Sequence, residues 1–268
     1  GRAIKLFIMI FYFSGTGNSL WVARQLQESL QEPFNKFGFD VLSSDQVYAL
    51  GEEERLGFVF PVYSWGPPEV VLEMISRLRL SREPSFLYFV CTCGDDAGKQ
   101  LKLLQGGGAS GLDLSGRLFR IYAEHIRLFA GFDVDAPEVE SRKREEAWGR
   151  VREIQVKIAG RESGFDCHEG SMPFLKTYVV RPLFCRFLMS ARWFHASDAC
   201  VSCGICEKVC PMNNIRVDRK PVWGKRCTQC LACYHFCPMH AVAYGSQTLN
   251  KGSIISKGSV RGSSLKSS

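Results

Sequence analysis

The sequence lacks the long apolar run that a transmembrane helix requires. Crossing a bilayer takes about 20 consecutive apolar residues, whereas the longest run here is the eight residues from Leu6 to Phe13. A run of that length is typical of a buried strand. No secretion signal is visible either. We therefore expect a cytoplasmic protein without a transmembrane segment.

Groups arranged for general acid–base catalysis are also scarce. Only five histidines are present among 268 residues, and none of them stands in a pattern typical of a catalytic base. Because no nucleophile can be paired with a base from the sequence, we assign no catalytic residue. His235 and His240 flank Cys237, and we expect them to pack beside a metal site rather than to bind the metal.

Excess positive charge is concentrated at the C-terminal end. The formal net charge is +7, but Lys251, Lys257, Arg261 and Lys266 lie in a stretch from residue 246 onward that has no Asp or Glu. This stretch, 246–268, is rich in Ser, Gly and Lys, and we expect it to be a disordered tail. The charge that remains on the rest of the chain is too small to indicate a nucleic-acid partner.

Cysteine, in contrast, is abundant and regularly spaced. Of 12 cysteines, eight form two runs that repeat at an offset of 27 residues, which predicts two pseudo-symmetric halves. Three thiolates at i, i+3 and i+6 can line a tight loop around three corners of an iron–sulfur cubane, and a following proline turns the chain away. The runs are Cys200-x2-Cys203-x2-Cys206-x3-Cys210-Pro211 and Cys227-x2-Cys230-x2-Cys233-x3-Cys237-Pro238.

The spacing of these runs resembles that of bacterial-type ferredoxins with two [4Fe–4S] clusters. The resemblance implies that each cluster takes its fourth thiolate from the other run. Zinc sites usually pair two Cys-x-x-Cys elements or add histidines, and disulfide frameworks suit small secreted domains, so both alternatives fit less well. The implied ligand sets are Cys200, Cys203, Cys206 and Cys237 for one cluster, and Cys227, Cys230, Cys233 and Cys210 for the other. The other four cysteines are expected to be buried free thiols.

A turn near the N-terminus is typical of an anion site. It follows an apolar run and precedes a helical pattern of apolar residues, so backbone N–H groups of the turn and of the helix start can point at a phosphate. It is neither a Walker motif nor a G-x-G-x-x-G dinucleotide motif. A glycine turn with a Ser or Asn helix cap is the alternative. The residues of the turn are Ser14, Gly15, Thr16, Gly17, Asn18 and Ser19.

The stretch from Tyr12 to Ser19 resembles the FMN phosphate loop of flavodoxins. Residues 9 to about 245 resemble flavodoxin–ferredoxin fusion proteins, which are found mainly in anaerobic bacteria and archaea. The resemblance implies that two further loops hold the flavin ring. One follows a strand-like stretch and contains Pro61, Val62, Tyr63, Ser64, Trp65 and Gly66, and the other follows the next such stretch and contains Thr92, Cys93, Gly94 and Asp95.

The two ring loops offer different chemistry. Tyr63 and Trp65 could stack on a planar ring, and a loop that covers its own core with these aromatics is the alternative. The backbone of the second loop could hydrogen-bond the polar edge of the ring. Carboxylates at Asp95 and Asp96 would disfavour an anionic reduced flavin, and capping of the following helix is their alternative role.

The predicted fold class is α/β, with a flavodoxin-like doubly wound parallel sheet followed by a small α+β ferredoxin-like domain. We expect an FMN-binding domain over 1–160, a linker over 161–197 and a ferredoxin domain over 198–245. A fifth strand is expected near 117–123. A last helix is expected after Pro137, with Trp148, Val151, Ile154 and Ile158 on its buried face.

The linker is apolar and aromatic, with basic residues interspersed. Pro182 is expected to break any single helix in this stretch. Packing of the linker between the domains is favoured over the alternative of an amphipathic membrane-surface segment.

Together these features favour an electron-transfer protein with two [4Fe–4S] clusters and FMN, which passes electrons to a redox partner protein or a small-molecule acceptor. One alternative is an FMN-dependent reductase of a small molecule that uses the clusters as an internal wire. Another is a non-redox interaction module that binds zinc. Between an electron carrier and an oxidoreductase the sequence makes no choice.

Overall fold

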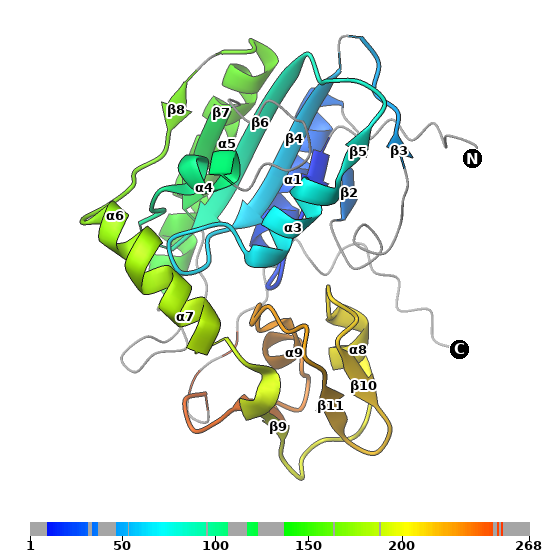
Figure 1. The fold of residues 1–268 in the computed structure, drawn as a ribbon. Helices are drawn as coiled ribbons and strands as arrows, with labels where there is room; N and C mark the ends of the chain where they lie inside the picture. Colours follow the sequence, from blue (N-terminus) through cyan, green and yellow to red (C-terminus); the bar gives the residue numbers. More distant parts are fainter. Residues whose placement is uncertain are drawn as a thin grey trace.

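The computed structural model describes residues 10–31, 34–36, 47–52, 54–94, 96–106, 117–122, 137–162, 164–187, 189–248, 251 and 253. Part of the strand expected over Leu6–Phe13 lies outside these residues, and so does Asp95. Figure 1 shows a sheet flanked by helices, with a smaller region beside it that contains the cysteine runs.

Six parallel strands form the main sheet, in the order β2-β1-β4-β6-β7-β8. Counted along the chain, these strands follow the doubly wound flavodoxin-type order, with β8 added at one edge. The predicted parallel α/β sheet is thus confirmed, and β7 matches the strand expected near 117–123. The strands are β1 (Ile10–Tyr12), β2 (Phe34–Lys36), β4 (Arg55–Pro61), β6 (Phe86–Cys93), β7 (Arg117–Tyr122) and β8 (Phe165–Asp166). A separate parallel pair joins β3 (Val47–Tyr48) to β5 (Arg79–Leu80).

Helices cover both faces of the main sheet because successive residues of a strand point to opposite sides. On one face, Phe11, Phe58 and Phe89 stack in a row across three neighbouring strands, with ring centroids 5.9 and 5.4 Å apart. This face packs against α3 (Glu69–Arg77) and α4 (Gln100–Gly106). The other face packs against α1 (Asn18–Leu30) and α5 (Pro137–Ala159).

Helix α5 is the helix expected after Pro137. Val151, Ile154 and Ile158 are fully buried, as predicted. Trp148 is the exception, because 38% of it is exposed. Its ring packs edge-on against Trp21 of α1 at 5.0 Å, so Trp148 lies at the rim of the helix contact rather than in the core.

The four cysteines outside the two runs form no disulfide in the described part of the chain. Cys91 and Cys93 lie buried in β6, as expected, whereas Cys167 and Cys185 are only partly buried. The sulfur atoms of Cys91 and Cys167 lie 3.9 Å apart, so β6 and the segment after β8 are in direct contact.

One helix, termed here the bridging helix, leads from the sheet toward the cysteine region (Figure 1). It comprises α6 (Pro173–Leu175), η1 (Lys176–Val180) and α7 (Arg181–Phe187). The expectation that Pro182 would break any single helix here is wrong. The turn η1 is π-helical, and the Arg181 N–H donates to the carbonyl of Lys176. This wider turn directly before Pro182 accommodates the proline ring and its missing N–H.

The inner side of the bridging helix packs on the sheet region. Arg181 is only 5% exposed, and its guanidinium donates to Glu69 Oε1 and to the Pro67 carbonyl, each at 2.5 Å. The Thr177 hydroxyl donates to the Trp65 carbonyl at 3.1 Å. The inner side thus packs on the sheet region, and the favoured interpretation of the linker, packing between the two domains, stays a prediction.

The outer side of the bridging helix carries exposed apolar side chains, including Phe174, Leu183 and Phe187. The alternative of a membrane-surface segment concerns this side and stays a prediction. No helix in the described part of the chain is long and apolar enough to cross a membrane.

Replacing Arg181 by methionine should lower the free energy of unfolding by about 1–3 kcal/mol, because the Pro67 carbonyl loses a charge-assisted donor. Arg186, further along the same helix, is exposed and serves as the control. Arg186→Met should change the free energy of unfolding by less than about 0.5 kcal/mol. Urea unfolding of both variants tests this. Equal effects would show that the Arg181 contacts do not hold the bridging helix.

The cysteine region is built from two small antiparallel strand pairs. Strand β10 (Ile215–Val217) pairs with β11 (Pro221–Trp223), and β9 (Phe194–Ala196) pairs with β12 (Val242–Tyr244). The helices are η2 (Ala191–Trp193), α8 (Ile205–Val209) and α9 (Ala232–His235).

Two segments extend beyond the expected limits of this region, 198–245. Strand β9 lies within the predicted linker. Thr248 lies within the predicted tail, yet it is 2% exposed and its hydroxyl accepts from the Tyr244 N–H at 2.7 Å. The packed chain therefore continues at least to Thr248.

Candidate functional site

The sequence repeat of 27 residues is also a structural repeat. Helix α8 corresponds to α9, and β10 corresponds to β12, at this offset. Even single contacts recur: the Asn214 N–H donates to the sulfur of Cys210, and the Ala241 N–H donates to the sulfur of Cys237, each at 3.3 Å. The two halves expected from the sequence are thus related in detail.

The first cysteine set consists of Cys200, Cys203, Cys206 and Cys237. All four line one hollow of about 340 Å³, its open mouth included. Burial is the main cause that raises the pKa of the Cys206 thiol, and the thiolates of the other three members raise it further. The structure therefore brings the fourth cysteine of the second run to the first three of the first run.

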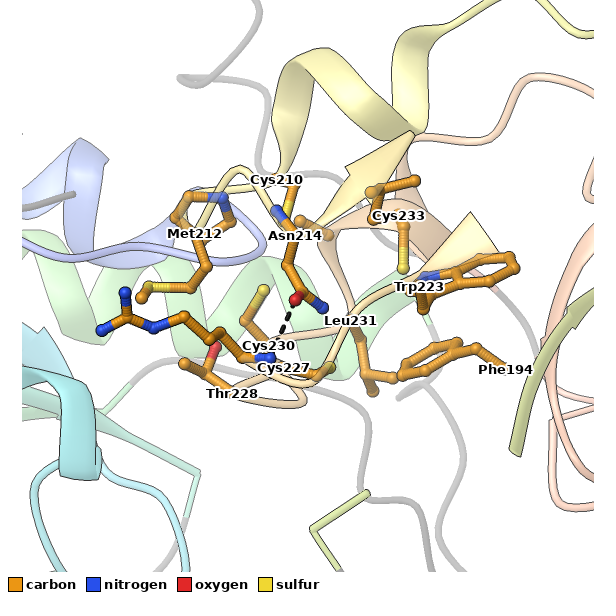
Figure 2. A pocket seen from close by; sticks show the side chains of 14 residues that line it. Phe194, Cys210, Met212, Asn214, Trp223, Cys227, Thr228, Cys230, Leu231 and Cys233 are labelled. Carbon is orange, nitrogen blue, oxygen red and sulfur yellow. Dashed lines mark hydrogen bonds between the residues drawn. The ribbon is translucent and has the colours of Figure 1, made fainter. Parts of the chain in front are cut away.

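The second cysteine set consists of Cys227, Cys230, Cys233 and Cys210. Figure 2 shows these four side chains around a hollow of about 320 Å³, its mouth included. Burial raises the pKa of the Cys227 thiol to about 12 and that of Cys233 well above its usual value, and neighbouring thiolates of the set raise both further. The same crossed grouping thus appears twice.

Such raised pKa values mean that the thiolates are unfavourable without a compensating charge. Metal binding supplies that charge, because it deprotonates a coordinating thiol outright. Among the described residues, no three His, Cys, Asp or Glu side chains gather closely enough to hold a single metal ion. A cubane binds one thiolate at each of four irons and so needs them further apart. The grouping fits a cubane better than a mononuclear zinc site.

The predicted phosphate loop connects β1 to α1. Gly17 has φ 104°, where a side chain would be strained, and its N–H donates to Ser14 Oγ at 3.2 Å. Among the described residues, no side-chain cap hydrogen bond is made at the start of α1, but Ser14 holds the turn before it, so the phosphate loop and the helix-cap alternative both stay predictions. The loop and the uncapped helix start fit a phosphate group. The Ser19 hydroxyl lies inward, 2.8 Å from Thr92 Oγ1 at the end of β6.

The first predicted ring loop is a tight turn. Tyr63 and Gly66 exchange two backbone hydrogen bonds, of 2.9 and 3.2 Å, while Ser64 and Trp65 have φ values of 49° and 57°. Two non-glycine residues in the left-handed region require outside support. The bridging helix provides it, because Thr177 donates to the Trp65 carbonyl and the Lys176 ammonium lies 5.6 Å from the Trp65 ring centroid.

The second predicted ring loop begins later than the sequence suggested. Thr92 and Cys93 belong to β6 and are buried, and the Thr92 carbonyl accepts from the Val62 N–H at 2.8 Å. Asp96 pairs with Lys176 of the bridging helix at 2.7 Å. This hydrogen bond is the main cause that lowers the Asp96 pKa. The charge of Asp96 is therefore compensated by Lys176.

The carboxyl ends of β1, β4 and β6 are neighbours in the sheet, so the three predicted flavin loops leave it at one edge. This edge contains the point where the strand order reverses, which is where open α/β sheets bind ligands.

The same edge meets the second cysteine set. A Cβ atom added to Gly15 would lie 2.5 Å from the Cys230 carbonyl oxygen and 3.1 Å from the Tyr63 hydroxyl oxygen. Burial raises the pKa of Tyr63 well above its usual value, and the thiolates of Cys230 and Cys227 raise it further. Met212, beside the second set, is 4% exposed and belongs to the core cluster of the sheet. The predicted flavin loops and the second cysteine set are thus in contact.

Several residues of this contact were not singled out from the sequence. Met212 follows a Cys-Pro pair that occurs twice, and nothing local distinguishes it from Met239. Lys176 and Thr177 act through partners about 80 and 110 residues away. Only their position in a segment rich in apolar and basic residues pointed toward an interface.

Comparison with known proteins supports the assignment of the cysteine region. Residues 199–242, which contain both cysteine sets, match the family model of the 4Fe-4S dicluster domain. Among solved structures, a "putative flavoprotein" from Bacteroides uniformis aligns with 45% of this chain and 94% of its own, at 15% identity and a TM-score of 0.29. A likeness at that level carries no argument for this chain. No curated protein matches the sequence.

Proposed function

We propose that this chain is an electron-transfer protein that holds a [4Fe–4S] cluster in each cysteine set and FMN at the adjoining sheet edge. The observation that carries the proposal is the meeting of Gly15, Tyr63 and Cys230. These residues come from the phosphate loop, the first ring loop and the second cysteine set. Such a contact between two cofactor sites suits internal electron transfer. When bound, the clusters supply one-electron steps, and the flavin accepts one or two electrons.

The side chains at the contact have definable roles in this proposal. Ser14, Thr16 and the N–H groups at the start of α1 bind the phosphate. Tyr63 and Met212 exclude water between the two sites. Tyr63 is partly buried there, and Met212 is almost wholly buried. The Asn214 N–H, through its bond to Cys210, stabilises negative charge on that sulfur. Compared with the expected domains 1–160 and 198–245, the sheet region in this proposal also includes β8, and the cysteine region also includes β9 and Thr248.

A second candidate is a reductase of a small-molecule acceptor with FMN at the same edge. One observation favours it: the bridging helix contacts both predicted ring loops, through Thr177 at Trp65 and Lys176 at Asp96. A wall over the ring loops could enclose a small acceptor, whereas a carrier needs an open flavin edge. The residues of the wall belong to the predicted linker.

Anaerobic purification tests the proposal directly. We expect about eight iron and eight sulfide per chain, together with one flavin released as FMN. Zinc in place of iron and sulfide would overturn the electron-transfer function and leave the interaction module. Iron and sulfide without flavin would remove only the FMN part. Steady reduction of a small acceptor without a partner protein would favour the reductase over the carrier.

A further inference from the structure

The structural repeat presents the same edge of each half to different surroundings. At the offset of 27 residues, Cys203 corresponds to Cys230 and Met239 corresponds to Met212. The edge beside the second cysteine set, formed by Cys230 and Met212, is covered by this chain's own sheet region. The equivalent edge beside the first cysteine set, termed here the open edge, is formed by Cys203, Met239 and Val201.

The covered edge shows what kind of surface fits there. Gly15 has no side chain, so the backbone of the phosphate loop approaches Cys230 closely. Met212 is 4% exposed and belongs to the same buried core cluster as Val62 and Val70 of the sheet region. An ion pair at 3.8 Å between Arg226 and Glu73 of α3 joins the same two regions. Close backbone approach, one apolar side chain and a peripheral ion pair thus make the contact.

The open edge has the same chemistry, but its residues are exposed and no segment of the described chain covers them as the sheet region covers Met212. Cys203 is exposed, Met239 is 46% exposed and Val201 is 60% exposed. All three line the hollow of the first cysteine set, so an apolar surface leads directly to the predicted cluster ligands. Exposed apolar residues around a functional hollow are typical of a docking site.

We propose that the open edge is the docking surface for an external one-electron redox protein, while the covered edge serves this chain's own flavin site. The inference rests on the proposed function. Its basis is the repeat: an edge of this shape already accepts a protein surface on the second half. A second copy of this chain fits poorly as the occupant, because its Gly15 and Tyr63 surface is already engaged with its own second cysteine set. The small apolar area suits a transient electron-transfer complex.

One electron passes from the docked partner to this chain in the proposed step. A reduced two-cluster ferredoxin, used as the probe, is oxidised by one electron while the docked chain is reduced by one, and no bond or proton needs to move. Methyl viologen radical, a small one-electron donor, serves as the comparison because it does not need a docking surface.

Two matched variants test the open edge. Val201→Glu places a charge on it, whereas Val222→Glu adds the same charge at a valine that is 67% exposed and lines neither hollow. We expect the second-order rate constant for reaction with the reduced ferredoxin to be roughly tenfold lower in the Val201→Glu variant than in the Val222→Glu variant. The reason is that docking would bury the new charge at residue 201. Met239→Gln, an uncharged change, should lower it in the same direction. Rates with methyl viologen should be equal for all.

Binding gives a readout that is independent of electron transfer. The affinity of the oxidised ferredoxin for the oxidised chain, measured by calorimetry, should fall for Val201→Glu and Met239→Gln but not for Val222→Glu. Equal effects of Val201→Glu and Val222→Glu, or none in either, would overturn the docking surface. Iron and sulfide content is measured first for each variant. A chain without clusters would instead contradict the proposed function, so the two failures are distinguishable.

Discussion

Replacing Cys203 and Cys237 together by alanine should leave one intact [4Fe–4S] cluster per chain, whereas replacing Cys203 and Cys210 together should leave none. The reason is the crossed grouping of the thiols. Cys203 and Cys237 line the same hollow, and Cys210 lines the other. The first double variant therefore damages one set twice, and the second damages each set once.

Alanine is preferred to serine because a serine oxygen can still bind iron. Total iron alone would be ambiguous, since a set with three cysteines can retain a partial cluster. Intact cubanes should be counted by Mössbauer spectroscopy and by spin quantitation of the reduced protein. Single, non-interacting clusters are expected for the Cys203 and Cys237 variant, and signals from two interacting clusters for the unchanged chain.

The opposite pattern would contradict crossed binding. If each run held its own cluster, the Cys203 and Cys210 variant would keep one intact cubane and the Cys203 and Cys237 variant would keep none. If the eight cysteines bound zinc, neither variant would show a cubane signal. The pair of variants thus tests the ligand sets as well as the metal.

Local spacing made the cysteine sets predictable. A thiolate loop of three cysteines is fixed within seven residues, and its repetition at 27 residues implied a second one. The helix after the phosphate loop and the helix after Pro137 were predictable for a similar reason, since apolar periods and glycine turns are local signals. The doubly wound sheet, in contrast, followed from the resemblance to flavodoxins. The loops at the carboxyl ends of β1, β4 and β6 then had to lie at one edge.

Contacts between distant segments were not predictable from such signals. Met212 and Met239 occupy equivalent places in the repeat, yet one is buried in the sheet core and the other is exposed. The difference comes from the position of the whole region, which no local pattern encodes. Asp96 likewise was expected near a flavin or a helix start, but its partner Lys176 lies 80 residues away.

Pro182 shows a different limit. Its effect on a regular α-helix is well defined, and the expected break followed from it. The chain avoids the break by changing the helix type, since η1 widens the turn before the proline. Trp148 shares its spacing with buried neighbours but lies at the rim, because a helix face is wider than its buried stripe.

Replacing Gly15 by alanine should separate the phosphate loop from the second cysteine set. The added Cβ would lie 2.5 Å from the Cys230 carbonyl oxygen and 2.7 Å from the Cys230 Cβ. Neither atom is the end of a flexible side chain, so one backbone must move. We expect a loss of about 1–3 kcal/mol in the free energy of unfolding, which is typical of overpacking.

Gly149 provides the matched control. It lies within α5, and a Cβ added there meets nothing within 4 Å. Gly149→Ala should therefore stabilise the protein by about 0.5–1 kcal/mol, because glycine is unfavourable in a helix interior. Urea unfolding of both variants under anaerobic conditions measures the difference.

Cofactor retention identifies what Gly15 is for. The main role of Gly15 could be to allow the close approach of the Cys230 backbone. In that case the Gly15→Ala variant should bind FMN nearly normally, and a chelator should remove iron faster from the second cysteine set than from the first. If its main role is close approach of the loop to the phosphate, FMN affinity should fall while both clusters keep their normal stability. The contact at Cys230 favours the first outcome. Gly15 lies where the phosphate loop meets a predicted cluster ligand. If Gly15→Ala leaves the rate of iron release from the second cysteine set unchanged, this contact does not support the second cluster, and the structural argument for internal electron transfer fails.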